Sequence, residues 1–239
     1  MKRVFRFSLI ILLLSIGCGL NAQNKKATKK KITEISLDSL IFKKLTNRLE
    51  VGYINPSQYY SKINSLAYDK SHSTTYFNGI SIGLTTELKL KNNLSLLTGV
   101  LYNLVYSDKL QKYPSSTFAN YISYGHYLNV PVHLLYSYPI TKNLKLFGFT
   151  GLTLNYGLLL KQNIVSTYNV PVFGITSAYT DLYQSDLNRL DLKVGVGGGV
   201  EYKQYQLKAG YNWGVLNINK LDTDILNQKG WFITFGIKL

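Results

Sequence analysis

Side chains that commonly act in acid–base catalysis or bind metals are scarce in this chain of 239 residues, which contains three histidines and one cysteine. His72 has the most suggestive neighbours, because the segment 69–73 also holds an aspartate and two serines. A hydrolytic triad is defined by its geometry and not by proximity in the sequence, and a polar cluster of this kind is more typical of a turn. We therefore predict no triad at His72.

His126 and His133 belong to one extended segment and differ in parity, so their side chains should point to opposite faces of a strand. His126 would face outward, as in some lipid-modifying barrel hydrolases, but the residue two positions later is Leu128 and not a serine. The histidines are widely separated, and one cysteine excludes a cysteine-based metal cluster. We predict no catalytic and no metal-binding residues, and keep a lipid-modifying enzyme using His126 or His72 as an alternative.

The glycine-rich segment 195–199 is the only run that resembles a phosphate-binding loop. It lacks the Lys-Ser/Thr pair that such a loop requires, and no helical pattern follows it. We interpret it as part of a strand in which small residues make room for neighbouring side chains. The sequence therefore predicts no cofactor.

Composition narrows the class of protein. Apolar residues make up 46% of the chain, which excludes a disordered protein. After residue 22 no apolar run approaches the roughly 18 residues that a membrane-spanning helix needs. The formal charge of +15, from 27 basic and 12 acidic residues, would suit nucleic acid, but much of it lies in the first 47 residues. We predict no nucleic-acid partner, because the N-terminus resembles an export signal.

Residues 1–22 have the three parts of a signal peptide. Lys2, Arg3 and Arg6 precede an apolar stretch, and small residues follow it up to Ala22. Signal peptidase I would cut after Ala22; alternatively, residues 15–18 form an imperfect lipobox that would leave Cys18 lipidated. Residues 23–47 carry seven lysines against two acidic residues, and we interpret them as a basic periplasmic N-terminal segment.

From residue 48 to residue 239 the apolar residues recur with a period of two, which is typical of strands. Ile80, Ile82 and Leu84, for example, alternate with Ser81 and Gly83. Eight such segments are expected, at about 48–55, 76–90, 94–106, 121–138, 144–157, 187–202, 205–216 and 230–239. Pro131 falls inside the fourth segment and would mark a bulge. Short and long connections alternate strictly, with long ones at about 56–75, 107–120, 158–186 and 217–229, as expected for an up-and-down barrel with turns at one rim and loops at the other.

The polar face of these strands contains small residues and charged residues of both signs, whereas the apolar face has almost no charged residues. The charged residues on the polar face are Arg48, Lys89, Lys145, Lys193, Lys208, Lys238, Glu50, Glu87, Asp191 and Glu201. A soluble barrel would place its charges outside, so this distribution predicts an apolar face in lipid and a charged lumen. Two groups of Tyr and Trp near the strand ends fit interfacial girdles. The predicted fold is an all-β, eight-stranded antiparallel transmembrane barrel in the outer membrane, with both chain ends in the periplasm.

Four short motifs resemble the PorT-like outer-membrane β-barrel family of Gram-negative bacteria: residues 79–84, 93–99, 148–151 and above all Tyr127-Leu128-Asn129-Val130-Pro131-Val132. The resemblance covers about residues 48–239. It implies contact with the barrel-insertion machinery through the last strand, where Phe235, Ile237 and Leu239 have the expected spacing. The family commonly ends in Phe and this chain ends in Leu. Some relatives assist secretion across the outer membrane.

The function expected from these observations is binding, or an assembly or secretion-accessory role, through the long loops, with outer-membrane lipid around the barrel. A protein or glycan partner is expected at the loop 158–186, which contains Tyr168, Tyr179, Tyr183 and the segment 170–173. Eight strands enclose little more than side chains, so a wide diffusion pore is disfavoured. A small-solute channel stays as an alternative, and the oligomeric state is not predicted.

Overall fold

The computed structural model describes residues 45–62, 74–90, 93–112, 118–167, 179–220 and 225–239. The predicted signal peptide at 1–22 and nearly all of the segment 23–47 lie outside the described residues. So do His72 and the segment 170–173 of the long loop. No helix in the described ranges is long and apolar enough to cross a membrane.

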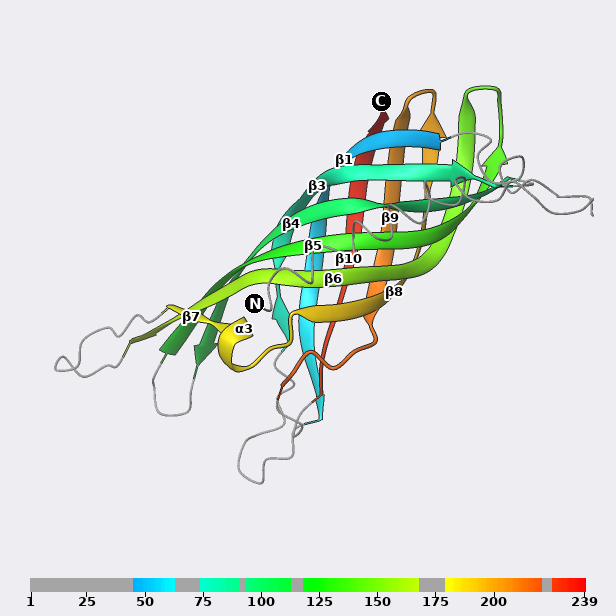
Figure 1. The fold of residues 1–239 in the computed structure, drawn as a ribbon. Helices are drawn as coiled ribbons and strands as arrows, with labels where there is room; N and C mark the ends of the chain where they lie inside the picture. Colours follow the sequence, from blue (N-terminus) through cyan, green and yellow to red (C-terminus); the bar gives the residue numbers. More distant parts are fainter. Residues whose placement is uncertain (1–44, 63–73, 91–92, 113–117, 168–178, 221–224) are drawn as a thin grey trace, which may run out of the picture. The chain divides into compact units, whose positions relative to one another are not determined.

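Eight strands form a closed antiparallel ring, as predicted (Figure 1). In ring order they are β1 (Leu45–Lys62), β3 (Asn78–Lys89), β4 (Leu94–Lys112), β5 (Phe118–Pro139), β6 (Leu144–Thr167), β8 (Leu190–Tyr202), β9 (Tyr205–Gly214) and β10 (Ile225–Lys238). The last strand pairs with the first from Arg48↔Lys238 onward, which closes the ring. Three small elements lie beside it: β2 (Thr75–Tyr76) pairs with β1, β7 (Tyr179–Asp181) pairs with β6, and helix α3 is Leu182–Ser185.

The short connections lie at the rim where the chain ends (Figure 1). Two of them contain a residue with positive φ, Asn93 at 65° and Lys203 at 53°, which is the backbone conformation that tight turns between strands require. The long connections lie at the opposite rim. The connections therefore alternate between the two rims as predicted, but the one between β4 and β5 is shorter than the predicted loop 107–120, because β4 continues to Lys112 and β5 begins at Phe118.

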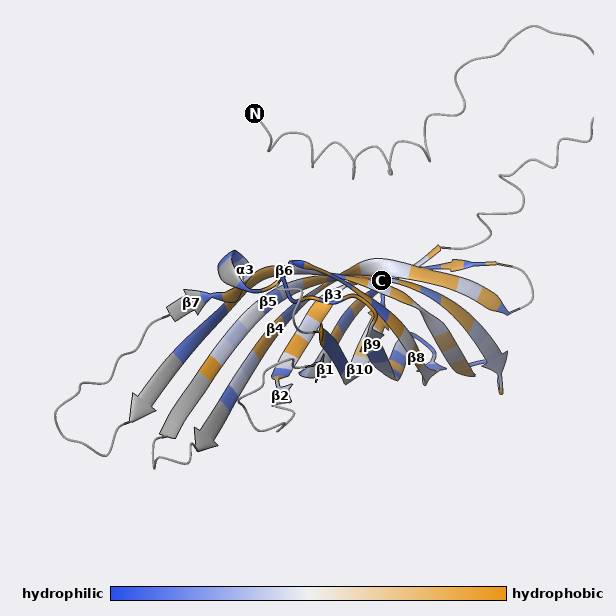
Figure 2. Ribbon diagram, turned by 90° about the horizontal axis from the view of Figure 1, so that it is seen from below, coloured by the Kyte–Doolittle hydropathy of each residue, from blue (hydrophilic) through white to orange (hydrophobic). Residues whose placement is uncertain are grey.

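The strands are apolar outside and polar inside. Ile80 and Leu84 are 59% and 56% exposed on the outer face, whereas Arg48 and Glu50 are each 1% exposed. The colours of Figure 2 alternate along the strands in the same way. This distribution is opposite to that of a soluble barrel and matches a strand surface that meets hydrocarbon.

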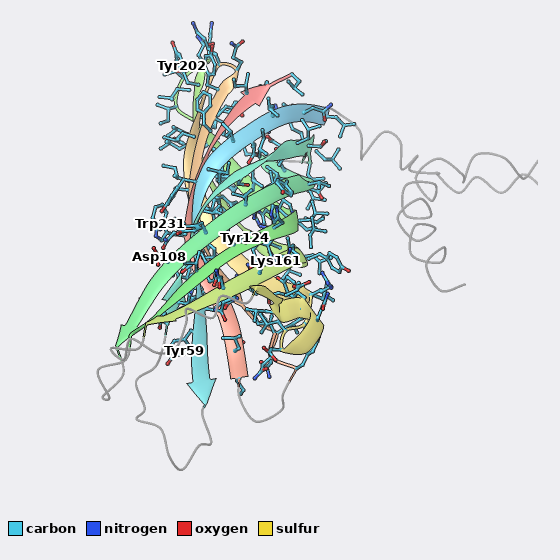
Figure 3. All side chains as sticks on the ribbon, turned by 90° about the vertical axis from the view of Figure 1, so that its left-hand side faces the viewer. Tyr59, Asp108, Tyr124, Lys161, Tyr202 and Trp231 are labelled. Carbon is cyan, nitrogen blue, oxygen red and sulfur yellow. The ribbon has the colours of Figure 1, made fainter. Side chains whose placement is uncertain are left out.

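Aromatic residues surround the barrel at two levels. Tyr136 and Tyr202 are exposed beside the short turns, and Tyr106 and Trp231 are exposed toward the loops. Figure 3 shows Tyr202 at one end of the barrel and Tyr59 at the other, with Trp231 between them. The exposed positions agree with the predicted girdles.

Strands β4, β5 and β6 are longer than predicted. They contain 19, 22 and 24 residues, and they continue beyond Tyr106 and Tyr156, where β3 and β8 last pair with them. The predicted loop 107–120 is therefore mostly strand, and residues 158–167 of the predicted loop 158–186 belong to β6. Residues 107–112 are mostly polar, but pairing with β5 satisfies the backbone groups on one side of this segment.

Pro131 does not mark a bulge. It is buried on the lumen face, and the register between β5 and β6 is unchanged across it. The register shift lies instead between His126 and Tyr127, opposite Gly157 and Leu159. The proline is tolerated because the pairing of β5 with β4 is interrupted there, from Asn129 to Val132, so no ladder donor is lost.

Candidate functional site

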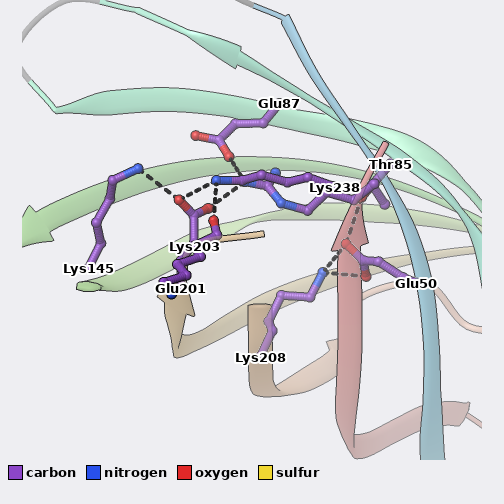
Figure 4. A network of polar contacts seen from close by, with 9 residues as sticks. Glu50, Thr85, Glu87, Lys145, Glu201, Lys203, Lys208 and Lys238 are labelled. Carbon is purple, nitrogen blue, oxygen red and sulfur yellow. Dashed lines mark hydrogen bonds and ion pairs between the residues drawn. The ribbon is translucent and has the colours of Figure 1, made fainter. Parts of the chain in front are cut away.

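A network of ion pairs fills the lumen near the short turns (Figure 4). Its centre is Arg48 on β1, whose guanidinium lies 2.6 Å from Glu87 on β3 and 2.6 Å from Glu201 on β8. Strand alternation places all three on the inner face, and closure of the ring brings β8 across from β1. Arg48 and Glu201 are 153 residues apart in the chain.

Five further residues extend the network. The other carboxylate oxygen of Glu201 accepts hydrogen bonds from Lys145 and Lys238, each at 2.7 Å. Glu50 accepts hydrogen bonds from Lys208 at 2.8 Å and from the Thr85 hydroxyl at 2.6 Å. These charges are therefore paired across the lumen, as expected for ions removed from water.

A layer of apolar side chains lies in the lumen beside the ion pairs. Leu97, Leu135, Phe147 and Phe149 are buried together, and Phe232 packs against them. The ring of His133 stacks on Phe149 with 5.1 Å between the ring centres. The sequence predicts a polar lumen, but the same alternation also places Phe147 and Phe149 on the inner face of β6. The lumen is therefore polar only in part.

A second apolar cluster closes the mouth of the barrel at the loop rim. We call it the plug; it consists of Phe77, Val105, Tyr127, Leu160, Tyr183, Leu187, Ile218 and Leu226. Four of these, Phe77, Tyr183, Leu187 and Ile218, come from the connections between strands and not from the ring itself. The rings of Tyr127 and Tyr183 meet edge to face, with 6.5 Å between their centres.

Helix α3 holds the plug in place. The Asp181 carboxylate accepts a hydrogen bond from the backbone of Tyr183 at 3.1 Å and caps the helix. Arg189 lies 5.0 Å from the centre of the Tyr183 ring and donates to the backbone oxygens of Gly157 and Leu158 at 3.0 and 2.7 Å. Burial raises the pKa of the Tyr183 phenol, so it stays neutral.

This arrangement corrects one prediction about the loop 158–186. Tyr183 was expected on an exposed surface for a partner, but it is only 7% exposed because it packs into the barrel mouth. Tyr168 and the segment 170–173 lie outside the described residues, so their part in that surface stays a prediction. Residues 158–167 belong to β6.

The two described histidines lie on opposite faces of β5. His126 is on the outer face, where its Nδ1 contacts the hydroxyl of Tyr102, and Tyr124 lies edge-on to its ring. His133 is inside, with its Nε2 3.1 Å from the Thr153 hydroxyl. The parity predictions for both are confirmed. Within the described ranges, no three His, Cys, Asp or Glu side chains are grouped so that they could hold a metal ion.

Comparison with known proteins identifies the family. The family described as "Outer membrane protein beta-barrel domain" matches residues 21–238. A search of curated proteins finds no match.

Among solved structures, the attachment invasion locus protein Ail of Yersinia pestis is 15% identical over 81% of this chain and 98% of its own, with a TM-score of 0.33. Neisserial surface protein A is 16% identical over 80% and 97%, with a TM-score of 0.35. The N-terminal β-barrel domain of Pseudomonas aeruginosa OprF is 12% identical over 82% and 100%, with a TM-score of 0.29. The family match extends over the whole ring, and the chain therefore belongs to the outer membrane protein β-barrel domain family.

Proposed function

We propose that this outer-membrane protein acts by binding, as an assembly or secretion-accessory component, and that it presents its partner site on the strands and loops beyond the lipid-facing ring. One observation carries the proposal. The lumen is closed by the ion pairs, the apolar layer and the plug, whereas β4, β5 and β6 continue past the ring. The part of the molecule available to a partner is therefore the rim.

The extension of β4, β5 and β6 has the features of a protein-binding edge. In the described pairings, residues 107–112 of β4 pair only with β5, because the register of β3 with β4 ends at Tyr106. Residues 164–167 of β6 likewise pair only with β5. Each edge leaves backbone donors and acceptors on one side, to which an extended segment of another protein could add as a strand.

Cross-linking tests this proposal. A photoreactive residue is introduced at Asp108, which is exposed on β4, and in a matched variant at Ala209, which is exposed on the lipid-facing part of β9. We expect a single saturable adduct with an envelope protein or glycan from Asp108 and none from Ala209. Replacing residues 109–121 with Asn-Gly should abolish the adduct and preserve the ring. Adducts of equal yield from both positions would contradict the proposal.

The two alternative functions, a diffusion channel and a lipid-modifying enzyme, predict results that differ from those of a binding protein. Stable single-channel steps in a planar bilayer would contradict the closed lumen. An enzyme using His126 or His72 would lose its activity on lipid when both are changed to alanine. We expect the double variant to keep the adduct at Asp108, because neither histidine lies on the extension.

Three finer assignments accompany the proposal. We propose that residues 1–22 direct export, that residues 23–47 remain in the periplasm, and that the chain is PorT-like within its family. The pattern of the last strand supports insertion by the barrel machinery, since Phe235, Ile237 and Leu239 all face outward and are at least 37% exposed.

A further inference from the structure

Two adjoining cavities lie inside the barrel between the plug and the ion pairs. Their water-accessible volumes are about 40 and 50 Å³. Ile54, Asn103, Asn129, Asn212 and Phe232 line both. The first reaches Tyr127 of the plug, and the second reaches Lys208 of the ion-pair network. We call the two together the chamber.

Two of the three lysines that line the chamber are paired with an acidic residue, and the third, Lys229, lies 4.8 Å from the centre of the Tyr59 ring. Lys193 donates to the side chain of Gln228 and lies 3.7 Å from Asp191. Lys208 is bound by Glu50 at 2.8 Å. A charged ligand would have to separate one of these pairs in a region where the separated ion has little water. The chamber therefore favours an uncharged ligand.

Four polar side chains that line the chamber have a buried atom without a hydrogen-bond partner among the described residues: Asn103, Tyr127, His133 and Asn212. The Oδ1 atom of Asn103 and the Nδ1 atom of His133 have no hydrogen-bond partner among the described residues, and both residues are 4% exposed. Such atoms are costly to bury, and native proteins usually supply them with a partner. Asn103 lines both cavities and His133 lines the second, so a ligand in the chamber can reach both residues.

The apolar residues that line the chamber indicate which other groups the ligand should contain. Ile54, Leu101 and Phe232 present apolar surface beside the polar groups. A hydroxyl can either donate or accept, whereas the hydrogens on its carbon can pack against such surface. A molecule with several hydroxyls on a short carbon chain meets both requirements. About 90 Å³ of water-accessible space in total leaves room for only a few heavy atoms.

We propose that the chamber is a binding site for a small neutral polyol of about three carbons, held by Asn103 and His133. The site is separate from the rim, so the inference does not rest on the proposed binding function. A ligand that enters from the loop rim would have to pass the plug. A bound polyol would connect the walls of β4, β5 and β10 and stabilise the ring from within.

Methyl NMR of the full barrel in detergent micelles tests the proposal, with glycerol as the probe. The barrel is refolded at each glycerol concentration, so that ligand can enter before the plug forms. We expect the Ile54 methyl resonance, inside the chamber, to shift saturably. The Ile80 methyl, exposed on the lipid face, should not follow it. Propan-1-ol, which has the same carbons but one hydroxyl, should need at least tenfold higher concentration.

Substitutions then separate specific binding from simple hydration. Asn103→Leu removes the unpartnered oxygen and should raise the glycerol midpoint about tenfold, the expected effect of losing one buried hydrogen bond. Asn103→Thr replaces the amide oxygen with a hydroxyl oxygen that can still accept a hydrogen bond, so it should give a smaller increase. This variant carries the test if the leucine variant does not fold. Asn143→Leu, in an exposed turn, is the matched control and should leave the midpoint unchanged.

Two results would overturn the proposal. An Ile54 shift that rises linearly with glycerol, and equally with propan-1-ol, would mean that the chamber holds water only. A saturable shift with the same midpoint in wild type and in both Asn103 variants would place the polyol elsewhere. Cross-linking at Asp108 is unaffected in either case, so failure here is distinguishable from failure of the proposed function.

Discussion

The centre of the ion-pair network offers the sharpest test of the closed lumen. Glu201→Gln keeps the shape of the side chain but removes the charge that Arg48 contacts at 2.6 Å. Arg48 is 1% exposed and would keep Glu87 as its one charged partner, so water cannot replace the carboxylate that it loses. Breaking a buried pair from one side typically costs about 3–5 kcal/mol. Lys145 and Lys238 also lose a partner, but they are 32% and 27% exposed, and each such loss adds only about 0–1 kcal/mol.

Equilibrium urea unfolding of the barrel in lipid vesicles, followed by tryptophan fluorescence and by heat-modifiable gel migration, measures this effect. We expect Glu201→Gln to lower the free energy of unfolding by about 3–5 kcal/mol. Lys145→Met, at the rim of the same network, should lower it by about 1 kcal/mol or less. Equal effects from the two variants would refute the assignment of Arg48 and Glu201 as a buried pair.

A compensated variant distinguishes lost charge pairing from lost packing. Arg48→Met combined with Glu87→Gln and Glu201→Gln leaves no isolated ion at the centre of the network. It should be more stable than Glu201→Gln alone, because the penalty in that variant comes from a buried guanidinium that has lost one of its two carboxylates, and the triple variant contains no such guanidinium. The triple variant could instead be less stable than Glu201→Gln by about 2 kcal/mol or more, which is roughly the cost of an additional packing defect. That result would show that packing, and not charge pairing, dominates.

Three other substitutions and one mass measurement test separate parts of the molecule. Val132→Arg, on the outward face of the middle part of β5, should destabilise the barrel in vesicles by about 2–4 kcal/mol, measured by the same urea titration. Gly197→Ala should cost about 1–3 kcal/mol in that assay, because the added carbon would lie 2.3 Å from the Ala209 backbone oxygen. Leu187→Asp should open the plug and raise ion conductance in planar bilayers, where we expect none from the wild type; an unchanged silent bilayer would mean that the ion pairs alone close the lumen. Mass spectrometry of the exported protein should give a chain that begins at Gln23, whereas an acylated chain that begins at Cys18 would select the lipobox.

Much of the fold could be predicted because strand alternation is a local property. Ile80 and Ser81 differ in polarity, and in an extended strand adjacent residues must face opposite sides. The same rule placed His126 outside and His133 inside. Strand ends were less predictable, since the polar residues 107–112 form a strand only where β5 lies alongside to pair with them.

The candidate sites depended on contacts that no local pattern contains. Tyr183 looked like a surface aromatic, and only the packing of α3 into the mouth shows that it is buried. The chamber is likewise invisible in the sequence, because Asn103 and His133 come from different strands and meet a common space only when the ring closes.

The amino-acid sequence by itself determined which face of each strand is apolar, and hence that the chain forms a barrel whose outer surface meets lipid. This follows from the two-residue period, which each strand carries alone. The tertiary structure decided which inward side chains meet. Glu201 is joined to Arg48, Lys145 and Lys238 from three other strands, and this set depends on strand register and ring closure. Those quantities arise from all eight strands together, so no single segment of the sequence specifies them.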